Sequence, residues 1–289
     1  MFSDNKEISY VGSLTDKRVA FVRGLSRRKN KPDCECFFLE GERAVSEVPL
    51  KQGSIDTLVL SRSYVEGVDT QYGRFAIIRK LQNCGAGTLY VTDKVFAAIT
   101  GTVSPQGIAA VVNKPRFGAL EPLLRGADRV LVLENLQDPG NLGTCIRTAD
   151  AYGFDAVICT DNCADVYNQK VLRSTVGSLF HIPVLEFSEG IFKLSVKLKA
   201  AGLRLFGADP RGGVSSIDRY FGKDRTAVII GNEARGLTDA ARAVSDELVT
   251  VPMAGNAESL NAAVAAAVLM YELSTRRDRP QNKPQNLDQ

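Results

Sequence analysis

The chain has 289 residues, of which 44% are apolar, and this length and composition are sufficient for two domains with separate hydrophobic cores. It contains no run of about eighteen apolar residues and no signal-peptide-like start, which predicts a cytoplasmic protein without a membrane partner. Six cysteines without a Cys-x-x-Cys pair and a single, distant histidine, His181, predict free thiols and no metal site. The net charge of +3 is too small to identify a partner by itself.

The positive charge is concentrated near the N-terminus, where residues 17–31 carry seven basic side chains and no acidic one. Val19, Val22 and Leu25 lie among them at helical spacing, which predicts a helix with one buried face and one exposed basic face. Such a face is either simply solvated or binds phosphate groups, and the unopposed charge favours phosphate contact. The candidate nucleic-acid contacts in this segment are Arg18, Arg23, Arg27, Arg28 and Lys29.

The next part of the chain has the pattern of a small α/β domain. Four short apolar runs of strand length are separated by segments that could be helical. These runs are CECFFLEG, IDTLVLS, GTLYV and GIAAVVN. The domain is expected to span residues 1–113, and two prolines and two glycines within residues 114–127 predict a linker.

A second domain is expected over residues 128–275. Its apolar runs are continuous, not alternating, and helical stretches divide them. The runs are RVLVLE, DAVICT, IPVLEF, LRLFGAD, TAVIIGN and ELVTVP. Continuous runs are typical of strands covered on both faces, which predicts a largely parallel sheet between helices. Residues 276–289 have almost nothing apolar to bury and are expected to be disordered.

Ligands of open parallel sheets bind beyond the carboxyl ends of the strands, so loops that follow strands are the first candidates for a site. One such loop is DPGNLGTCIRTADAYGF, which combines turn residues with an apolar stripe of helical spacing. The spacing leaves Arg147 off that stripe and one turn after Gly143. Arg147 could therefore meet a phosphate or carboxylate, or it could form an ordinary surface ion pair.

Two later loops also need an explanation. GNEARGL contains Gly231, which permits close approach to the backbone, and Glu233, a carboxylate at the end of an apolar strand. VPMAGNAESLNAAVAAAVLMYEL opens a helix in which Ser259 could be the cap and Asn261 is one polar residue in an apolar stretch. Its alanines offer a flat face on which a second copy could pack. The stripe expected on this helix comprises Leu260, Val264, Ala267, Val268 and Tyr271.

Taken together and in this order, the three loops resemble the three motifs of the SpoU/TrmH family of AdoMet-dependent RNA ribose 2′-O-methyltransferases, within the SPOUT superfamily. The resemblance extends to the N-terminal half, where LTDKRVAFVRGLSRRKNK, FFLEGERAVSE and SPQGIAAVV look like a ribosomal-protein-like substrate-binding domain. Arg43, in the second of these segments, joins the candidate RNA contacts.

The resemblance implies several properties that the residues alone do not. It implies a small N-terminal α/β RNA-binding domain followed by a parallel-sheet SPOUT domain, whose C-terminal part forms a trefoil knot. It implies AdoMet as the methyl donor, no metal, and a homodimer that shares its active site. By analogy with family members, ribosomal RNA, and 23S rRNA in particular, is favoured over tRNA as the substrate. A housekeeping enzyme and an antibiotic-resistance enzyme would look alike at this level.

The resemblance also assigns roles to individual residues. The catalytic positions are Asn141, Arg147, Glu233, Ser259 and Asn261. The cofactor would contact Gly231, Val251 and Leu260, with Leu133, Gly207 and Met253 as neighbours. Two departures from the family pattern, Ala234 and the segment NAAVAAA, do not touch a position expected to carry chemistry.

The chemistry of the expected reaction limits the role of Arg147. A guanidinium is effectively always protonated, so we expect Arg147 to grip the phosphate beside the target ribose and stabilise the alkoxide. The proton could leave to that phosphate, to Glu233 or to water. Two other classes are disfavoured. A non-catalytic ribosomal RNA-binding protein could lose Arg147 or Asn261, and a dinucleotide enzyme should show Gly-x-Gly-x-x-Gly after its first strand.

Overall fold

The computed structural model describes residues 8–27, 34–67, 74–102, 104–211 and 225–275. The chain forms two units. One comprises residues 1–116 together with Tyr167–Phe180, and the other comprises residues 117–166 and 181–289. The tail expected to be disordered, residues 276–289, lies outside the described residues.

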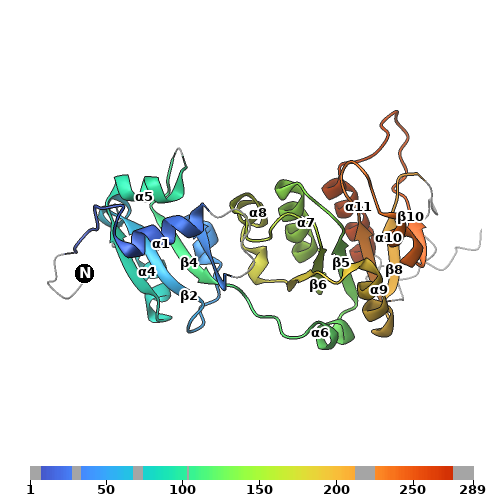
Figure 1. The fold of residues 1–289 in the computed structure, drawn as a ribbon, viewed down its shortest axis with the longest axis horizontal. Coiled ribbons are helices and arrows are strands. Elements are labelled where there is room, and N and C mark those ends of the chain that lie inside the picture. The colour runs from blue at the N-terminus through green and yellow to red at the C-terminus, as the bar shows by residue number, and fades with distance from the viewer. Residues whose placement is uncertain (1–7, 28–33, 68–73, 103, 212–224, 276–289) are drawn as a thin grey trace, which may run out of the picture. The chain divides into compact units, whose positions relative to one another are not determined.

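The first unit contains a four-stranded mixed sheet (Figure 1). Its strands are β1 (Cys36–Glu40), β2 (Ile55–Ser61), β3 (Gly87–Val91) and β4 (Ile108–Asn113), in the order β1-β4-β2-β3. The pair β2–β3 is parallel, and β4 is antiparallel to both of its neighbours. Each strand coincides with one of the four apolar runs, so the predicted strands are confirmed.

Helices supply the rest of this unit's core. They are α1 (Lys17–Ser26), α2 (Glu42–Ser46), α3 (Arg62–Glu66), α4 (Arg74–Asn83) and α5 (Asp93–Thr100). Asp16 caps α1 by accepting hydrogen bonds from the backbone N–H groups of Arg18 and Val19. The predicted apolar face of α1 is confirmed, because Val19, Val22 and Leu25 are buried against the sheet.

Residues Tyr167–Phe180 also belong to this unit, although they follow the second strand of the C-terminal domain in sequence. They form α8 (Gln169–Thr175) and the short 3-10 helix η1 (Ser178–Phe180). The ring of Phe37 in β1 lies 4.9 Å from that of Tyr167 and 6.2 Å from that of Phe180, measured between centroids. Gln169 Nε2 donates to the carbonyl of Phe38 at 2.6 Å. The sequence places this segment within the C-terminal domain, and nothing in its pattern indicates these contacts.

The second unit is built on a six-stranded sheet in which every pair is parallel. The strands are β5 (Arg129–Leu133), β6 (Ala156–Thr160), β7 (Val184–Phe187), β8 (Arg204–Ala208), β9 (Thr226–Ile230) and β10 (Glu247–Val249). Their order is β10-β8-β9-β5-β6-β7. The α/β fold with a parallel sheet is therefore confirmed, and all six apolar runs are strands.

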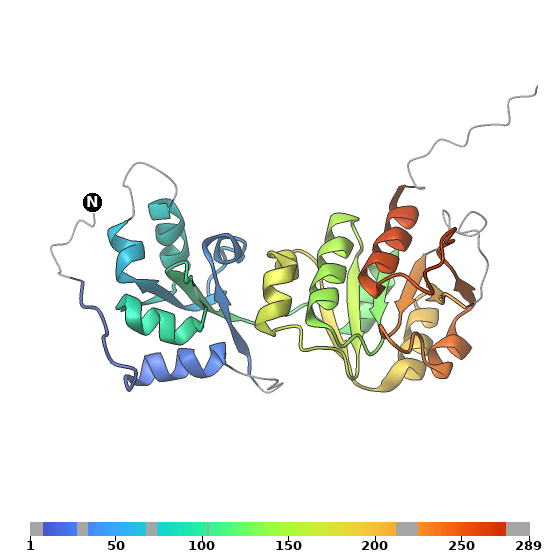
Figure 2. The ribbon, with the colours of Figure 1, turned by 90° about the horizontal axis from the view of Figure 1, so that it is seen from above.

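Helices cover this sheet. The main core joins the strands to α6 (Leu120–Gly126), α9 (Gly190–Ala200) and α10 (Asp239–Val244). The helices α7 (Pro139–Ala151) and α11 (Ala262–Thr275) pack against each other, as Figures 1 and 2 show. Helix α6, which falls within the segment 114–127 expected to be a linker, contributes Leu124 to this core. Pro122 is tolerated there because it lies in the first turn of α6, where its missing N–H has no helical partner.

The orientation expected for α11 is wrong. The residues it buries are Ala263, Ala266, Leu269, Met270 and Leu273. Two members of the predicted stripe, Val264 and Tyr271, are instead 49% and 45% exposed. Almost every side chain of this helix is apolar, so hydrophobic periodicity does not indicate which face packs on α7.

Candidate active site

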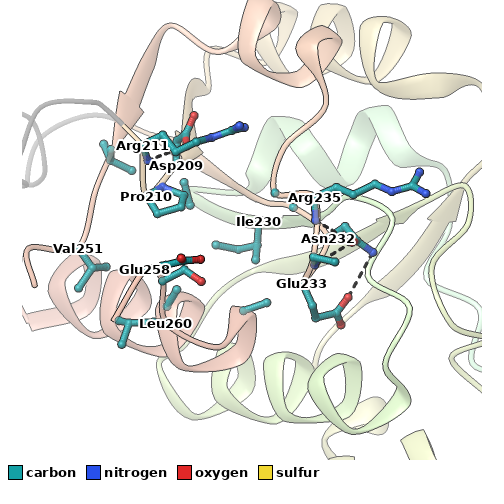
Figure 3. A pocket seen from close by; sticks show the side chains of 18 of the residues that line it. Asp209, Pro210, Arg211, Ile230, Asn232, Glu233, Arg235, Val251, Glu258 and Leu260 are labelled. Atoms are coloured by element: carbon teal, nitrogen blue, oxygen red, sulfur yellow. Dashed lines mark hydrogen bonds and ion pairs between the residues drawn. The ribbon is translucent and has the colours of Figure 1, made fainter. Parts of the chain in front are cut away.

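A pocket of about 280 Å³ lies where β8, β9 and β10 end (Figure 3). Its walls come from Ala208–Arg211 after β8, Ile230–Gly236 after β9, and Val251, Met253 and Glu258–Leu260 between β10 and α11. This position agrees with the expectation that ligands of parallel sheets bind at the carboxyl ends of the strands. Its volume is near the lower end of pockets that hold small molecules, about 300 Å³ and above.

One wall is a tight backbone loop that only glycine permits. Asn232 and Gly236 exchange backbone hydrogen bonds of 3.0 and 2.8 Å, which folds the loop back on itself. A Cβ placed on Gly231 would lie 2.3 Å from the carbonyl carbon of Gly236, a distance at which the backbone would have to move. The glycine thus allows the two ends of the loop to meet.

Beside the pocket, three polar side chains from distant segments form one hydrogen-bonded network. Glu233 Oε1 accepts from the backbone N–H of Asp138 and from Asn141 Nδ2, both at 3.1 Å. Asn141 Oδ1 in turn accepts from Asn261 Nδ2 at 3.1 Å. The network therefore connects the loop after β5, the loop after β9 and the start of α11.

Helix α7 positions its part of the network through its own N-terminus. Asp138 is the N-cap and accepts from the backbone N–H of Asn141 at 2.8 Å, and Pro139 opens the first turn. The predicted apolar stripe is confirmed, because Leu142, Cys145, Ile146 and Ala149 are buried. With that face fixed against the sheet, Asn141 must lie at the end of the helix near Glu233.

At the start of α11, Asn261 has two functions. Its Oδ1 accepts from the backbone N–H groups of Ala263 and Val264, at 2.9 and 3.3 Å, while its Nδ2 reaches Asn141. Asn261, not Ser259, is therefore the side chain that caps this helix. Ser259 is exposed and lines the pocket.

The structure brings four of the five predicted catalytic residues to one place but not the fifth. Asn141, Glu233 and Asn261 are joined by hydrogen bonds, and Ser259 lies two residues from Asn261. Arg147 is exposed two turns along α7. Within the described part of the chain, it makes no hydrogen bond or ion pair with the others.

The predicted cofactor contacts divide into two groups. Gly231, Val251, Met253 and Leu260 line the pocket, whereas the described lining does not include Leu133 or Gly207. Leu133 is fully buried in the core. A Cβ on Gly207 would lie 2.7 Å from Ser245 Oγ, so this glycine permits close packing of β8.

The candidate RNA contacts of the first unit differ in exposure. Arg43 is exposed, and the side chain of Arg18 is 64% exposed although it pairs with Asp16 at 3.0 Å. Arg27 donates to the carbonyl of Ala98 at 3.2 Å, and Arg23 is half-buried. Arg28 and Lys29 lie outside the described residues.

Sequence reasoning missed several charged residues at the site. Asp209, Arg211, Arg235, Arg242 and Glu258 all line the pocket. Asp209 could have been found, because it directly follows the apolar run LRLFGA at the carboxyl end of a predicted strand. Arg242 could not, because it lies within a helix and reaches the pocket only through the fold.

Another missed residue connects the loop after β5 to the loop after β9. Glu134, which follows β5, is only 3% exposed. Its carboxylate accepts from the backbone N–H of Thr238 at 3.0 Å and from the Thr238 hydroxyl at 2.6 Å. The loop after β9 is thus held against the loop after β5.

Three cysteines lie beneath the loop after β5. Cys163 Sγ accepts from the backbone N–H of Leu136 at 3.3 Å and lies 3.2 Å from the carbonyl oxygen of Leu133. The hydrogen bond with the Cys159 thiol lowers the pKa of Cys163 and raises that of Cys159. Burial raises the pKa of Cys145 to about 12.

The described residues contain no group of three or more His, Cys, Asp or Glu side chains that could hold a metal ion. Among the same residues, no helix combines the length and the apolar character that a membrane span requires.

Comparison with known families and proteins agrees with the motif assignments. Residues 128–271 match the model of the SpoU rRNA Methylase family, and residues 16–110 match the MRM3-like substrate binding domain. A Bacillus subtilis relative, named 23S rRNA (guanosine(2553)-2'-O)-methyltransferase RlmP, is 35% identical over 91% of this chain and 98% of its own. A Streptomyces viridochromogenes relative, named 23S rRNA (uridine(2479)-2'-O)-methyltransferase, is 37% identical over 60% of this chain and 62% of its own.

Solved structures show the same relationship. An AdoMet-bound rRNA methyltransferase from Sinorhizobium meliloti has a TM-score of 0.78 at 28% identity, and the match covers 92% of this chain and 97% of that one. The SpoU methyltransferase AviRb from Streptomyces viridochromogenes in complex with AdoMet has a TM-score of 0.74 at 28% identity, covering 91% and 99%. The resemblance of the three loop motifs is confirmed, and the chain belongs to the SpoU rRNA methylase family.

Proposed function

We propose that the protein is an AdoMet-dependent RNA 2′-O-methyltransferase that transfers a methyl group to a ribose 2′-hydroxyl of 23S ribosomal RNA. The observation that carries the proposal is the network of Glu233, Asn141 and Asn261 at the edge of a pocket formed by the family's motifs. The full-length Bacillus subtilis relative is named as a 23S rRNA enzyme, which supports this RNA over tRNA.

The pocket fits AdoMet in its chemistry. Ile230, Val251 and Leu260 offer apolar surface for an adenine ring, and Gly231 lines the same pocket. Carboxylates and guanidinium groups line the same pocket and complement a ligand that carries both signs of charge. We assign Gly231, Val251, Met253 and Leu260 to the cofactor.

In the proposed mechanism, the protein aligns the ribose hydroxyl and stabilises the charge that develops on it. The bound cofactor supplies a methyl group on a positively charged sulfur. Arg147 binds the phosphate beside the target ribose and stabilises the alkoxide, because a guanidinium cannot act as a base. Glu233 accepts hydrogen bonds from Asp138, Asn141 and Asn232, which supports a role in orienting Asn141. The proton then leaves to the RNA phosphate or to water.

We also propose that the enzyme is a homodimer in which α7 and α11 form the interface. Val264 and Tyr271 on α11 are about half exposed, and the ring of Tyr271 lies 5.9 Å from that of Tyr152 after α7. An apolar surface of this kind beside Arg147 supports packing against a second copy. Such an arrangement places Arg147 of one subunit near the pocket of the other.

The same proposal includes the roles of the two domains, the trefoil knot and the cellular location. We assign RNA binding to residues 1–113 and catalysis to the SPOUT domain that ends near residue 275. A trefoil knot at the C-terminal end is supported by the strand order, in which β9 inserts between β8 and β5. A cytoplasmic location is consistent with a ribosomal RNA substrate.

The decisive experiment maps ribose methylation in cells that lack the gene. Total RNA from these cells, and from cells complemented with wild-type protein or with Arg147→Ala, is tested for positions that resist alkaline cleavage. We expect one protected ribose in 23S rRNA to disappear and to return only with the wild-type protein. Loss of a protected position in tRNA alone would identify the alternative substrate. Unchanged RNA together with no AdoMet binding in calorimetry would support a non-catalytic RNA-binding protein.

A further inference from the structure

Helix α1, which packs beside α5 on the sheet of the first unit (Figures 1 and 2), presents an aromatic side chain to solvent. Phe21 is 49% exposed, although Val19, Val22 and Leu25 of the same helix are buried in the core. An isolated exposed apolar side chain is ordinary in a folded protein. Phe21, however, lies within residues 17–31, which carry seven basic side chains and no acidic one. Its neighbours along the chain therefore attract phosphate groups.

The turn of α1 that precedes Phe21 carries two cations. Lys17 and Arg18 come four and three residues before Phe21, which places them beside it on the helix surface. Both are exposed, and Arg18 also pairs with the N-cap Asp16 at 3.0 Å. At the other end of the helix, Arg27 is exposed and donates to a carbonyl of α5. The ring of Phe21 thus lies between two positively charged ends.

The turn that follows Phe21 contains a glycine that neither the backbone nor the packing requires. Gly24 lies inside α1, whose C-cap is Arg27, so it is not the left-handed glycine that often ends a helix. A Cβ placed on Gly24 would have no neighbouring side chain or other segment of the described structure within 4 Å. Glycine inside a helix destabilises it relative to alanine. The helix therefore keeps an unfavourable residue at an exposed position that could accept a side chain.

Gly24 leaves one side of the Phe21 ring uncovered. Helical side chains point toward the N-terminus of their helix, so a side chain at position 24 would lie over the turn that carries Phe21. With glycine at this position, a flat group can approach both the ring and the helix backbone. An open aromatic ring between cations fits a nucleotide, which combines a flat aromatic base with a negative phosphate.

We propose that Phe21 binds an unpaired nucleotide of the RNA substrate by stacking its ring on the base. Lys17 and Arg18 then contact the adjoining phosphates, and Gly24 leaves room for the nucleotide. A base within a duplex is not available for this contact, because neighbouring base pairs cover both of its faces. The first unit thus recognises an unpaired segment of the RNA. The proposal rests on the proposed function in naming RNA as the ligand.

The test separates stacking from charge through the salt dependence of binding. Filter binding measures the Kd of the full-length protein for a 23S rRNA transcript at a series of KCl concentrations. The variants are Phe21→Ala, Phe21→Tyr, Gly24→Leu and Lys17→Gln. Leu50→Ala is the matched control, because Leu50 is another exposed apolar side chain of the first unit, at 54%. Thermal unfolding and light scattering verify the fold and the oligomeric state of each variant.

We expect Phe21→Ala to weaken RNA binding by at least about fivefold at every salt concentration, without a change in the slope of log Kd against log[KCl]. Phe21→Tyr keeps the flat ring and should stay within about twofold of the wild type. Gly24→Leu should weaken binding as Phe21→Ala does, although its Tm should not fall, because leucine is the better helix former. Lys17→Gln should instead reduce the slope by about one. Leu50→Ala should bind like the wild type.

Three results would overturn the inference. The first is a Phe21→Ala variant, or a Gly24→Leu variant, that binds RNA as tightly as the wild type. The second is a loss of affinity that Phe21→Tyr shares, because a ring would then not be what matters. The third is a change of oligomeric state in Phe21→Ala with unchanged RNA affinity, which would assign Phe21 to a protein contact. A wild type that binds no 23S rRNA would instead contradict the proposed function, and the inference would fail with it.

Discussion

Asn141 lies at the centre of the candidate site, and its neighbours define the orientation of its amide. Its Nδ2 donates to Glu233 and its Oδ1 accepts from Asn261. A carboxylate can only accept, so the amide nitrogen must face Glu233 and the oxygen must face Asn261. The amide of Asn261 is fixed by the same logic, because its oxygen caps α11. The site is thus organised before it binds RNA or cofactor.

Replacing Arg147 tests its proposed contact with phosphate. Arg147→Lys keeps the charge but loses the planar, bidentate geometry, so we expect kcat to fall by about tenfold or more. The affinity for AdoMet should not change, since the proposed partner of Arg147 is the RNA phosphate and not the cofactor. Methyl transfer to 23S rRNA from labelled AdoMet measures the rate. Arg125→Lys, at an exposed position of α6, is the control, and a lysine variant of Arg147 with the full wild-type rate would contradict the proposed role.

The cysteines beneath the loop after β5 should differ in reactivity. Because its hydrogen bond with Cys159 lowers its pKa, Cys163 forms the thiolate at a lower pH than an ordinary cysteine does. The pKa of Cys145 is raised to about 12, and that of Cys159 is also raised, so both remain protonated at pH 8. Mass spectrometry after brief treatment with iodoacetamide at pH 8 should find Cys163 modified first of the three. In urea the three should react alike, and earlier reaction of Cys145 in the folded protein would refute the assignment.

At the scale of the elements, substitutions of Asn261 can separate its two functions, which are to cap α11 and to donate a hydrogen bond to Asn141. Asn261→Asp keeps the oxygen that accepts from Ala263 and Val264, but it loses the donor to Asn141. We expect nearly unchanged stability and a kcat reduced by about tenfold or more. Asn261→Ala removes both functions and should also lose about 1 kcal/mol of stability.

Thermal unfolding and the methylation assay together distinguish these two variants. About 1 kcal/mol corresponds to a fall of about 2–4 °C in Tm for a domain of this size. An aspartate variant that methylates as fast as the wild type would show that the amide donor is not required. A large loss of stability in that variant would show that the carboxylate is not tolerated beside Asn141.

The strands were predictable because their signal is local. Each of β5 to β10 is a short apolar run between polar loops, and burial on both faces requires that composition. The same logic located Asn141, Glu233 and Asn261, since each lies in a loop after a strand or at the first turn of a helix that follows one. Hydrophobic periodicity failed to predict the buried face of α11, where Val264 and Ala263 are both apolar but only Ala263 is buried.

Long-range contacts were not predictable. Tyr167 and Phe180 look like ordinary residues of the C-terminal domain, and only the fold places them on Phe37 of β1. The pairing of Asp209 with Arg242 has the same character, because no local pattern relates a residue after β8 to one within α10. The residues alone left Arg147 open between a phosphate contact and a surface ion pair, and the family resemblance assigned it to catalysis. In the single chain it has no partner among the described residues.

For the whole molecule, the proposed dimer interface can be broken at one residue. Val264→Glu places a charge on the half-exposed face of α11, where burial against a second copy would remove it from water. We expect light scattering after size-exclusion chromatography to show a dimer for the wild type and a monomer for this variant, with activity lost. Phe192→Glu is the matched control, because Phe192 is 69% exposed on α9, away from α11. A Val264→Glu variant that remains dimeric would place the interface elsewhere.

The packing of Tyr167–Phe180 on β1 means that the chain passes between the two units three times, near residues 116, 166 and 180. A protease that cuts once, before α6, would therefore not release the N-terminal part. The fragment would stay associated through the aromatic contacts of Phe37 and the hydrogen bond of Gln169, and would separate only in denaturant. A nicked enzyme of this kind behaves as two complementing fragments, so an intact elution profile does not prove an intact chain.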